Sequence, residues 1–191
     1  KEENIACEKI KDVYLGNEYT DDEIEAEFVN WDKEYKYKKY NNVEAEIARL
    51  LNDGKVIGRF NGAMEFGPRA LGNRSILIHP TNKDINDIVN KRLKRTEFMP
   101  FAPSVIDFRA KDYFIGFRES DITADWMTIT YDVFPERVKE IDAVVHVDKT
   151  ARPQIVKEDA NPSYYKILKE FNEISGLGCF VNTSFNMHEE P

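Results

Sequence analysis

Two kinds of apolar spacing alternate along this chain, and their alternation restricts the folds that it can adopt. Apolar residues recur at helical spacing in three stretches, residues 42–53, 81–94 and 161–176, as expected for helices that bury one face. Short apolar runs around these stretches predict strands. The predicted strands cover residues 55–60, 75–79, 102–106, 126–131, 143–147 and 178–182. Helices and strands that alternate in this way favour an α/β or mixed α+β domain.

Residues 1–40 are interpreted as a linker or leader segment from a preceding domain, and residues 41–191 as the folded domain. Within the leader, Thr20–Glu23 has the pattern of a capping box and predicts a short helix to about Phe28. The lysine-tyrosine run at residues 35–40 fits either a nucleic-acid surface or a solvated connecting strand. The chain does not begin with methionine and stops directly after a motif-like segment, so both ends are interpreted as cuts in a longer polypeptide, with the domain truncated at its C-terminus.

The formal net charge of -8 is unevenly distributed, because residues 55–95 hold nine basic and three acidic side chains, a net of +6. An acidic protein binds nucleic acid poorly in general, so the local basic stretch indicates a small anionic ligand instead. No apolar run approaches the length of a membrane span. Cys7 and Cys179 lie too far apart for a metal motif or a disulfide framework, which favours a reducing cytoplasm. Neither nucleic acid nor a membrane is expected as a partner.

The densest cluster of unusual residues is Gly62–Ser75, which lies between two predicted strands and is therefore a loop. Its glycines, Gly67 among them, allow backbone amides to approach a ligand closely. Arg69 and Arg74 each offer a fork of donors that matches phosphate oxygens, and Glu65 suits pairing with an arginine or binding a hydroxyl. The alternative is a turn with ordinary surface arginines, but the density of Gly, Pro, Arg and Asn favours an anion site.

Two further cationic segments follow this loop. Lys94 and Arg95 belong to a helix end with four cations, which the helix dipole alone would favour. An aromatic-proline turn at residues 98–103 then directs this cationic end toward a fixed place. Thr150 and Arg152, after a predicted strand, offer another anion contact.

Asn182 and Ser184 follow the apolar part of the last predicted strand. Open α/β sheets bind ligands at such places, although an Asx or Ser turn explains these residues about equally well. His79, His146 and His188 are too scattered for a metal cluster, and the chain has no Walker A loop, His-Glu-x-x-His or Gly-x-Ser-x-Gly motif. From its residues alone, the chain is a domain that binds an anion such as a phosphate, and its reaction stays open.

Four stretches resemble, in order and spacing, the O-carbamoyltransferase family of the NodU/CmcH type. They are Met64–Ser75, Pro100–Pro103, His146–Arg152 and Asn182–Asn186. The first is long and rarely met elsewhere, and the resemblance runs from about Val13 to the end of the chain.

The resemblance implies a cytoplasmic enzyme with two domains. An N-terminal actin-like domain, absent from this chain, would hold a metal ion, expected to be iron, and would transfer the carbamoyl group to an acceptor hydroxyl. The C-terminal domain would have a YrdC-like fold, a twisted mixed sheet with flanking helices. It would use ATP with Mg²⁺ and carbamoyl phosphate to make carbamoyl adenylate. This chain resembles the C-terminal domain, so its expected partners are these two substrates and the N-terminal domain of the same polypeptide, and a homodimer is a further expectation.

The resemblance also assigns roles to residues. Arg69, Lys94 and Arg152 match positions expected to act in catalysis. The expected substrate- and nucleotide-binding residues are Glu65, Gly67, Arg74, Arg95, Thr150, Asn182 and Ser184. Met99 stands where the family usually has arginine, so one phosphate contact is either missing or supplied by a neighbour such as Arg95. No residue is expected to bind a metal.

Two other functions fit the same pattern. A threonylcarbamoyl-adenylate synthase-like domain shares the YrdC-like fold, but it is expected to have a basic surface toward RNA, which the net charge of -8 disfavours. A non-catalytic module that senses a phosphate metabolite would bind its ligand without ever releasing pyrophosphate.

Overall fold

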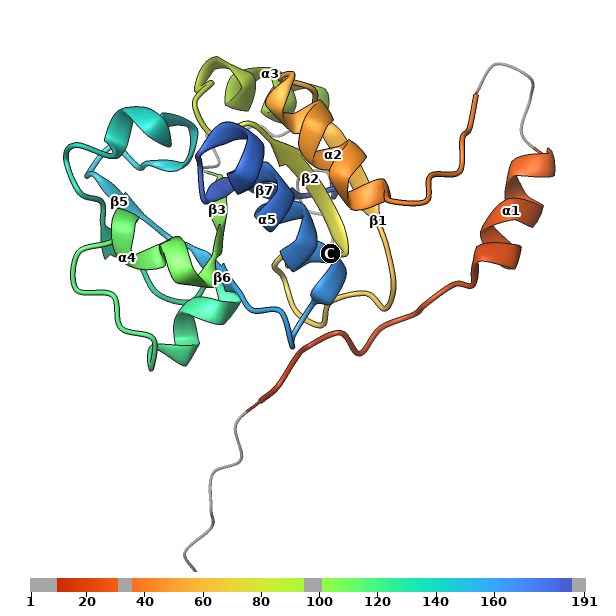
Figure 1. Cartoon of the computed structure of the whole chain (residues 1–191), viewed down its shortest axis with the longest axis horizontal. Helices are drawn as coiled ribbons and strands as arrows, with labels where there is room; N and C mark the ends of the chain where they lie inside the picture. The colour runs from red at the N-terminus through yellow and green to blue at the C-terminus, as the bar shows by residue number, and fades with distance from the viewer. Residues whose placement is uncertain (1–9, 31–35, 95–100, 187–191) are drawn as a thin grey trace, which may run out of the picture.

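The computed structural model describes residues 10–30, 36–94 and 101–186, and its centre is a five-stranded mixed sheet (Figure 1). The strands lie in the order β1-β2-β7-β3-β6, and every neighbouring pair is antiparallel except the parallel pair of β3 and β6. The short strands β4 and β5 form a separate antiparallel pair. The strand bounds are β1 Ile57–Phe60, β2 Arg74–Ile78, β3 Ala102–Ile106, β4 Tyr131–Asp132, β5 Thr150–Ala151, β6 Gln154–Val156 and β7 Cys179–Ser184.

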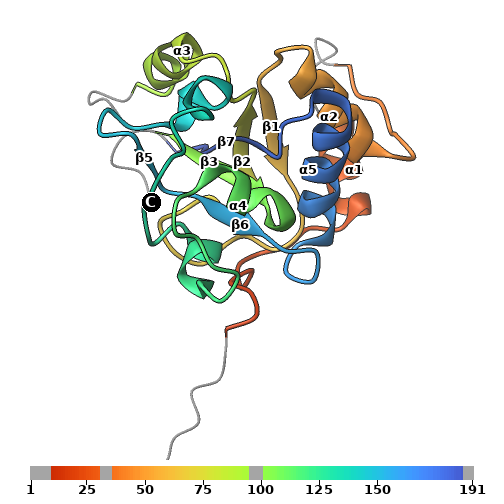
Figure 2. The ribbon, with the colours of Figure 1, turned by 60° about the vertical axis from the view of Figure 1, so that its left-hand side comes forward.

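Two helices, α2 (Val43–Asn52) and α5 (Pro162–Ser175), lie side by side on one face of the sheet (Figure 1, Figure 2). Their apolar stripes meet alternate residues of the central strands, such as Leu77 and Phe180, in one core. These two sheet residues are fully buried. The apolar residues that recur at helical spacing in α2 and α5 therefore pack against the inward-facing apolar residues of the central strands.

Capping residues set the ends of these helices, as the sequence predicts from Asn161 and Pro162 at the start of α5 and from Gly54 and Gly176 after α2 and α5. Asn161 Oδ1 accepts the amide of Tyr164 at 3.1 Å at the start of α5, and Pro162 occupies the first turn. Gly176 ends α5 with a φ of 76°, and Gly54 follows α2 with a φ of 75°. Both glycines adopt the left-handed conformation that favours a residue without a Cβ atom.

The opposite face of the sheet is covered by shorter elements. The helices α3 (Asp84–Arg92) and α4 (Ala110–Tyr113) and several 3₁₀ turns enclose a second core. This core includes Val105 and Cys179 from the sheet and Tyr113 from α4. Cys179 is fully buried, and burial raises the pKa of its thiol, so it packs in this core as a small apolar residue.

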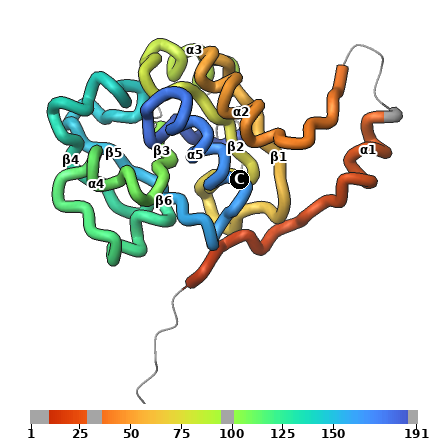
Figure 3. Tube along the Cα trace, viewed as in Figure 1, coloured from red at the N-terminus to blue at the C-terminus, as the bar shows by residue number. Residues whose placement is uncertain are grey.

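The N-terminal segment carries one helix, α1 (Asp21–Asn30), which stands apart from the sheet (Figure 1, Figure 3). Its start is the expected capping box. The backbone amide of Glu23 donates a hydrogen bond to Thr20 Oγ1, and the backbone amide of Thr20 donates one to Glu23 Oε2. The segment before α1 runs along the loop between β1 and β2 (Figure 3).

Two of the expected strands are wrong. Residues 126–130 form the end of a 3₁₀ turn and a loop, because Met127 takes a left-handed φ of 54° that interrupts an extended run, and only Tyr131 belongs to a strand, the short β4. Residues 143–147 also lie outside the sheet, since the backbone of Ala143 bonds to Pro80 O and to Asn86 Nδ2 instead of to a strand. Strand β6 was not predicted from the sequence, because its three residues are too few to show the two-residue alternation of a strand.

Gly72 and Gly54 provide a matched test of how tightly the fold is packed. Gly72 has a φ of 117°, and an added Cβ atom would lie 2.5 Å from the buried ring of Tyr164. Gly72→Ala is expected to cost at least about 3 kcal/mol of unfolding free energy, from overpacking and backbone strain together. A Cβ atom at Gly54 would have no neighbour within 4 Å, so Gly54→Ala should lower the free energy of unfolding only by the cost of a left-handed alanine, about 1–2 kcal/mol. Urea denaturation measures both, and equal losses would contradict the packing argument.

Candidate functional site

A buried carboxylate organises the loop between β1 and β2. Glu65 is only 6% exposed, and its Oε1 accepts the backbone amides of Leu71 at 2.8 Å, Asn73 at 2.6 Å and Arg74 at 3.1 Å. The expected partner of Glu65, an arginine or a ligand hydroxyl, is thus replaced by the loop itself. These three amides are also unavailable to a ligand, because an internal anion already occupies them.

The carbonyl groups of the same loop are satisfied by buried or half-buried side chains from distant parts of the chain. Ala70, Leu71 and Gly72 each present a carbonyl oxygen that accepts at least one such donor, at 2.8–2.9 Å. The donors are Asn182 to Ala70, Tyr14 and Gln154 to Leu71, and Arg59 to Gly72. A loop with its donors and acceptors bonded in this way is held in one conformation.

Arg74 belongs to this framework. Its guanidinium donates to four backbone carbonyls, those of Asn61, Asn73, Asn17 and Gly62, and it stacks 3.7 Å from the centre of a phenylalanine ring. Burial lowers the pKa of Arg74. Arg74 was expected to bind substrate, but in this structure its donors clamp the loop.

Arg69 and Arg152 form the candidate site, a cleft of about 450 Å³ that they line together with Trp126. Arg69 is exposed and Arg152 is half-buried. Neither guanidinium has an ion pair or hydrogen bond within the part of the chain that the structure describes, and the Nε atom of Arg152 is buried without a partner. Burial and the neighbouring charge of Arg69 both lower the pKa of Arg152. Two unpaired cations that repel each other create a place for an anion.

A second groove, of about 520 Å³, adjoins this cleft on the other side of Arg69. Its lining includes the expected residues Glu65, Gly67, Arg74 and Ser184. Gly67 has a φ of 106° at the exposed tip of the loop. Four of the residues expected from the sequence therefore share one groove with Arg69.

Asn182 lies directly beneath the loop. It is a mid-strand residue of β7, 2% exposed, rather than a residue at a strand end. Its Nδ2 atom donates to Ala70 O, Ser104 Oγ and Gln154 Oε1, while its Oδ1 atom is buried without a partner. Asn182 thus supports the loop that carries Arg69, and its Oδ1 is an acceptor still to be satisfied.

The remaining expected residues lie elsewhere. Lys94 is exposed just after α3, with a φ of 53°, and lines neither cleft. The backbone amide and the hydroxyl of Thr150 both donate to Asp148 Oδ1, at 3.0 and 2.8 Å; these bonds close the turn before β5 and lower the pKa of Asp148. Arg95 and Met99 lie outside the described residues.

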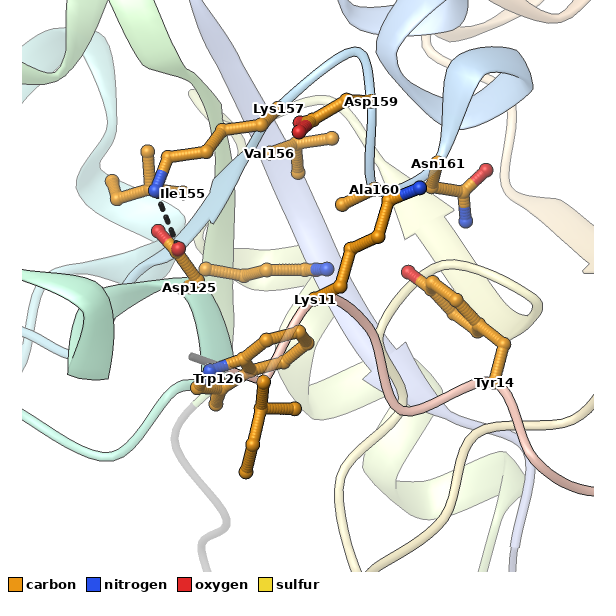
Figure 4. Close-up of a pocket in the computed structure, with 12 residues that line it drawn as sticks. Lys11, Tyr14, Asp125, Trp126, Ile155, Val156, Lys157, Asp159, Ala160 and Asn161 are labelled. Atoms are coloured by element: carbon orange, nitrogen blue, oxygen red, sulfur yellow. Dashed lines mark hydrogen bonds and ion pairs between the residues drawn. The ribbon is translucent and has the colours of Figure 1, made fainter. Parts of the chain in front are cut away.

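A third cleft, of about 260 Å³, contains residues that the sequence analysis did not single out (Figure 4). Lys11 and Tyr14 come from the N-terminal segment, and Asp125 pairs with Lys157 at 2.5 Å on the opposite side. Trp126 borders both this cleft and the cleft of the two arginines. No sequence signal pointed to these residues, because Lys11 and Tyr14 fell in the leader and Trp126 in a wrongly predicted strand.

Among the described residues, no group of three or more His, Cys, Asp or Glu side chains is placed to hold a metal ion. Within the same ranges, every helix is too short or too polar to cross a membrane.

A family model described as "Carbamoyltransferase C-terminus" matches residues 48–191. The chain belongs to this carbamoyltransferase family. An uncharacterized protein of Methanocaldococcus jannaschii, MJ1051, is 39% identical over 98% of this chain, which spans 38% of that relative. Nodulation protein NolNO of Sinorhizobium fredii is 38% identical over 96% of this chain, which spans 27% of that relative. The chain therefore spans less than half of the length of these two relatives.

A solved structure of similar fold is full-length HypF in its phosphate- and nucleotide-bound form. The TM-score is 0.53 at 18% sequence identity, and the match covers 78% of this chain and 21% of that chain. The likeness shows the fold, so the YrdC-like fold class expected from the sequence, a mixed sheet with flanking helices, is confirmed.

Glu65→Gln tests whether the buried carboxylate holds the loop of this carbamoyltransferase-family domain. Glutamine keeps the shape of the side chain but removes the charge that three amides share. We expect a loss of about 2–3 kcal/mol in the free energy of unfolding, measured by urea denaturation. Glu18→Gln is the control, because Glu18 is exposed and should change stability by less than about 0.5 kcal/mol. A Glu65→Gln effect as small as that would contradict the role of Glu65.

Proposed function

We propose that this domain binds ATP and carbamoyl phosphate and joins them into carbamoyl adenylate, which then carbamoylates an acceptor hydroxyl. The observation that supports this most directly is the pair of unpaired arginines, Arg69 and Arg152, in one cleft. Membership of the carbamoyltransferase family supports carbamoyl transfer as the reaction class.

Both proposed substrates are polyanions, and bringing them together requires fixed positive charge. A guanidinium binds phosphate oxygens through two parallel N–H groups, and in a partly dry cleft this attraction is stronger than in water. The backbone of the loop is hydrogen-bonded both before and after Arg69, so the charge of Arg69 is held at the cleft before a ligand binds. HypF, whose fold is similar, was solved in a phosphate- and nucleotide-bound form, which is consistent with such a site.

The atom balance of the proposed reaction defines its products. Carbamoyl adenylate contains one phosphorus atom from ATP and none from carbamoyl phosphate. Carbamoyl phosphate must therefore lose its phosphate to one water molecule, leaving carbamate. A carbamate oxygen then attacks the α-phosphorus of ATP and expels pyrophosphate. The protein supplies no nucleophile, so its contribution is positioning and charge neutralisation, and Mg²⁺ would arrive with the phosphates of ATP.

The final transfer is proposed to take place in another domain of the same polypeptide, which would hold a metal ion, iron in our expectation. This chain spans 38% and 27% of the two relatives, which leaves room for such a domain in them. A cytoplasmic location and a homodimer belong to the same proposal.

Arg69→Ala and Arg152→Ala test the proposed function. With carbamoyl phosphate at about 100 times its dissociation constant, the unmodified chain should gain about 2.7 kcal/mol of stability, and each variant should gain much less. Thermal melting with and without ligand measures this gain. Pyrophosphate release from MgATP should also depend on carbamoyl phosphate and fall at least about a hundredfold in each variant.

The control is Arg118→Ala, because the Arg118 side chain is 80% exposed and contacts only Asp121. It should leave both readouts unchanged. If carbamoyl phosphate stabilises the arginine variants as much as the unmodified chain, the site assignment is wrong. If ligands bind normally but no pyrophosphate forms, the domain binds these metabolites without joining them.

A further inference from the structure

The segment just before α1 is bonded along the loop that carries Arg69. Phe66 donates its amide to Val13 O at 2.8 Å, Gly16 donates to Met64 O at 2.9 Å, and Met64 donates to Asn17 O at 3.1 Å. Together with the bridge between residues 14 and 65, these bonds form a short antiparallel ladder. The ladder fixes residues 64–66, where the exposed part of the loop begins.

The close approach in this ladder depends on Gly16. A Cβ atom at that position would lie 2.8 Å from Met64 Cβ and 3.0 Å from Met64 O. The segment therefore fits against the loop rather than passing near it.

Tyr14 reaches from the same segment to the far end of the exposed loop. Its hydroxyl donates to Leu71 O at 2.9 Å, and the same oxygen accepts Gln154 Nε2 at 2.8 Å. Burial raises the pKa of Tyr14 to about 12, so the phenol remains a donor at neutral pH. Figure 4 shows the ring turned inward from the N-terminal segment, with its hydroxyl toward Asn161.

Residues 67–70 lie between these two attachment points. Arg69 is the positively charged residue of this span. Within the described chain, the backbone amides of Gly67, Arg69 and Ala70 donate no hydrogen bond. The position of the Arg69 guanidinium therefore depends on how firmly the two ends of the span are held. The N-terminal segment contributes at both ends, at one through its backbone and at the other through Tyr14, where Glu65 and Gln154 also bond Leu71 and Asn182 bonds the carbonyl of Ala70.

We propose that Tyr14 is a positioning residue for Arg69, and that the segment 13–17 is part of the anion site. This inference rests on the proposed function, because it assumes that Arg69 binds a phosphate. It extends the site beyond residues 48–191, which the family model matches, into a segment that is interpreted from the sequence as part of a leader, although the family resemblance begins at about Val13. Tyr14 touches no reacting atom in this proposal and acts through the loop.

Tyr14→Phe removes one hydroxyl and keeps the packed ring, and inorganic pyrophosphate is a suitable probe because it binds without reacting. We expect binding by the whole chain, measured by titration calorimetry, to weaken about fivefold to tenfold, the usual effect of one lost buried hydrogen bond. Tyr19→Phe is the matched control, because Tyr19 is 48% exposed and lies on the same segment. It should leave pyrophosphate binding unchanged.

A double-mutant cycle separates positioning from a general loss of stability. Arg69→Lys retains a charge on a flexible side chain, so Tyr14→Phe should weaken binding less than about twofold in that background. In the Arg152→Lys background the full effect should remain. Equal losses in both backgrounds, or no loss from Tyr14→Phe alone, would overturn the role of Tyr14 while leaving the anion site intact. No pyrophosphate binding by the unmodified chain would overturn the proposed function and this inference together.

Discussion

The carboxylate of Glu65 is an anion that the protein supplies to its own loop, and the arrangement of the candidate site follows from it. Three amides that point inward at one oxygen force the chain to turn tightly between Leu71 and Arg74. The turn directs the carbonyls of Ala70 to Gly72 toward the sheet, where buried side chains of β1, β6 and β7 donate hydrogen bonds to them. Residues 67–70 are thereby left on the outside, and Arg69 is the charged residue among them.

Arg69 and Arg152 show how a protein with a net charge of -8 can still offer a site to a polyanion. The acidic side chains lie mainly on exposed surfaces, as in α1, whereas the two arginines lie together in the lining of one cleft. Their mutual repulsion is tolerated because the loop that carries Arg69 is bonded at both of its ends and the turn before Arg152 is closed by Thr150. A bound phosphate would relieve this repulsion, so the free energy of folding and that of binding are linked at this place.

Local rules predicted the parts of this fold that depend on neighbouring residues. Asn161, Gly54 and Gly176 marked helix ends correctly because capping is a short-range interaction. The loop predicted at residues 62–75 does lie between two strands, although its last two residues, Arg74 and Ser75, belong to β2. The role of Glu65 was not predictable, since its partners are amides whose direction depends on the folded loop. Tyr14 was missed for the same reason, because its bond to Leu71 spans 57 positions of the sequence.

Arg59 has a consequence for how ligands reach the site. Its guanidinium donates hydrogen bonds to the carbonyl oxygen of Gly72 and to Ser163 Oγ at the start of α5. The hydroxyl of Ser163 in turn donates to the carboxylate of Glu44 in α2. The loop therefore shares one cooperative unit with the α2–α5 pair, and opening it would cost much of the free energy of global unfolding. In the proposed reaction, substrates would enter and products would leave through the solvent-facing side of the cleft, past a loop held at its base, rather than by the opening of a lid.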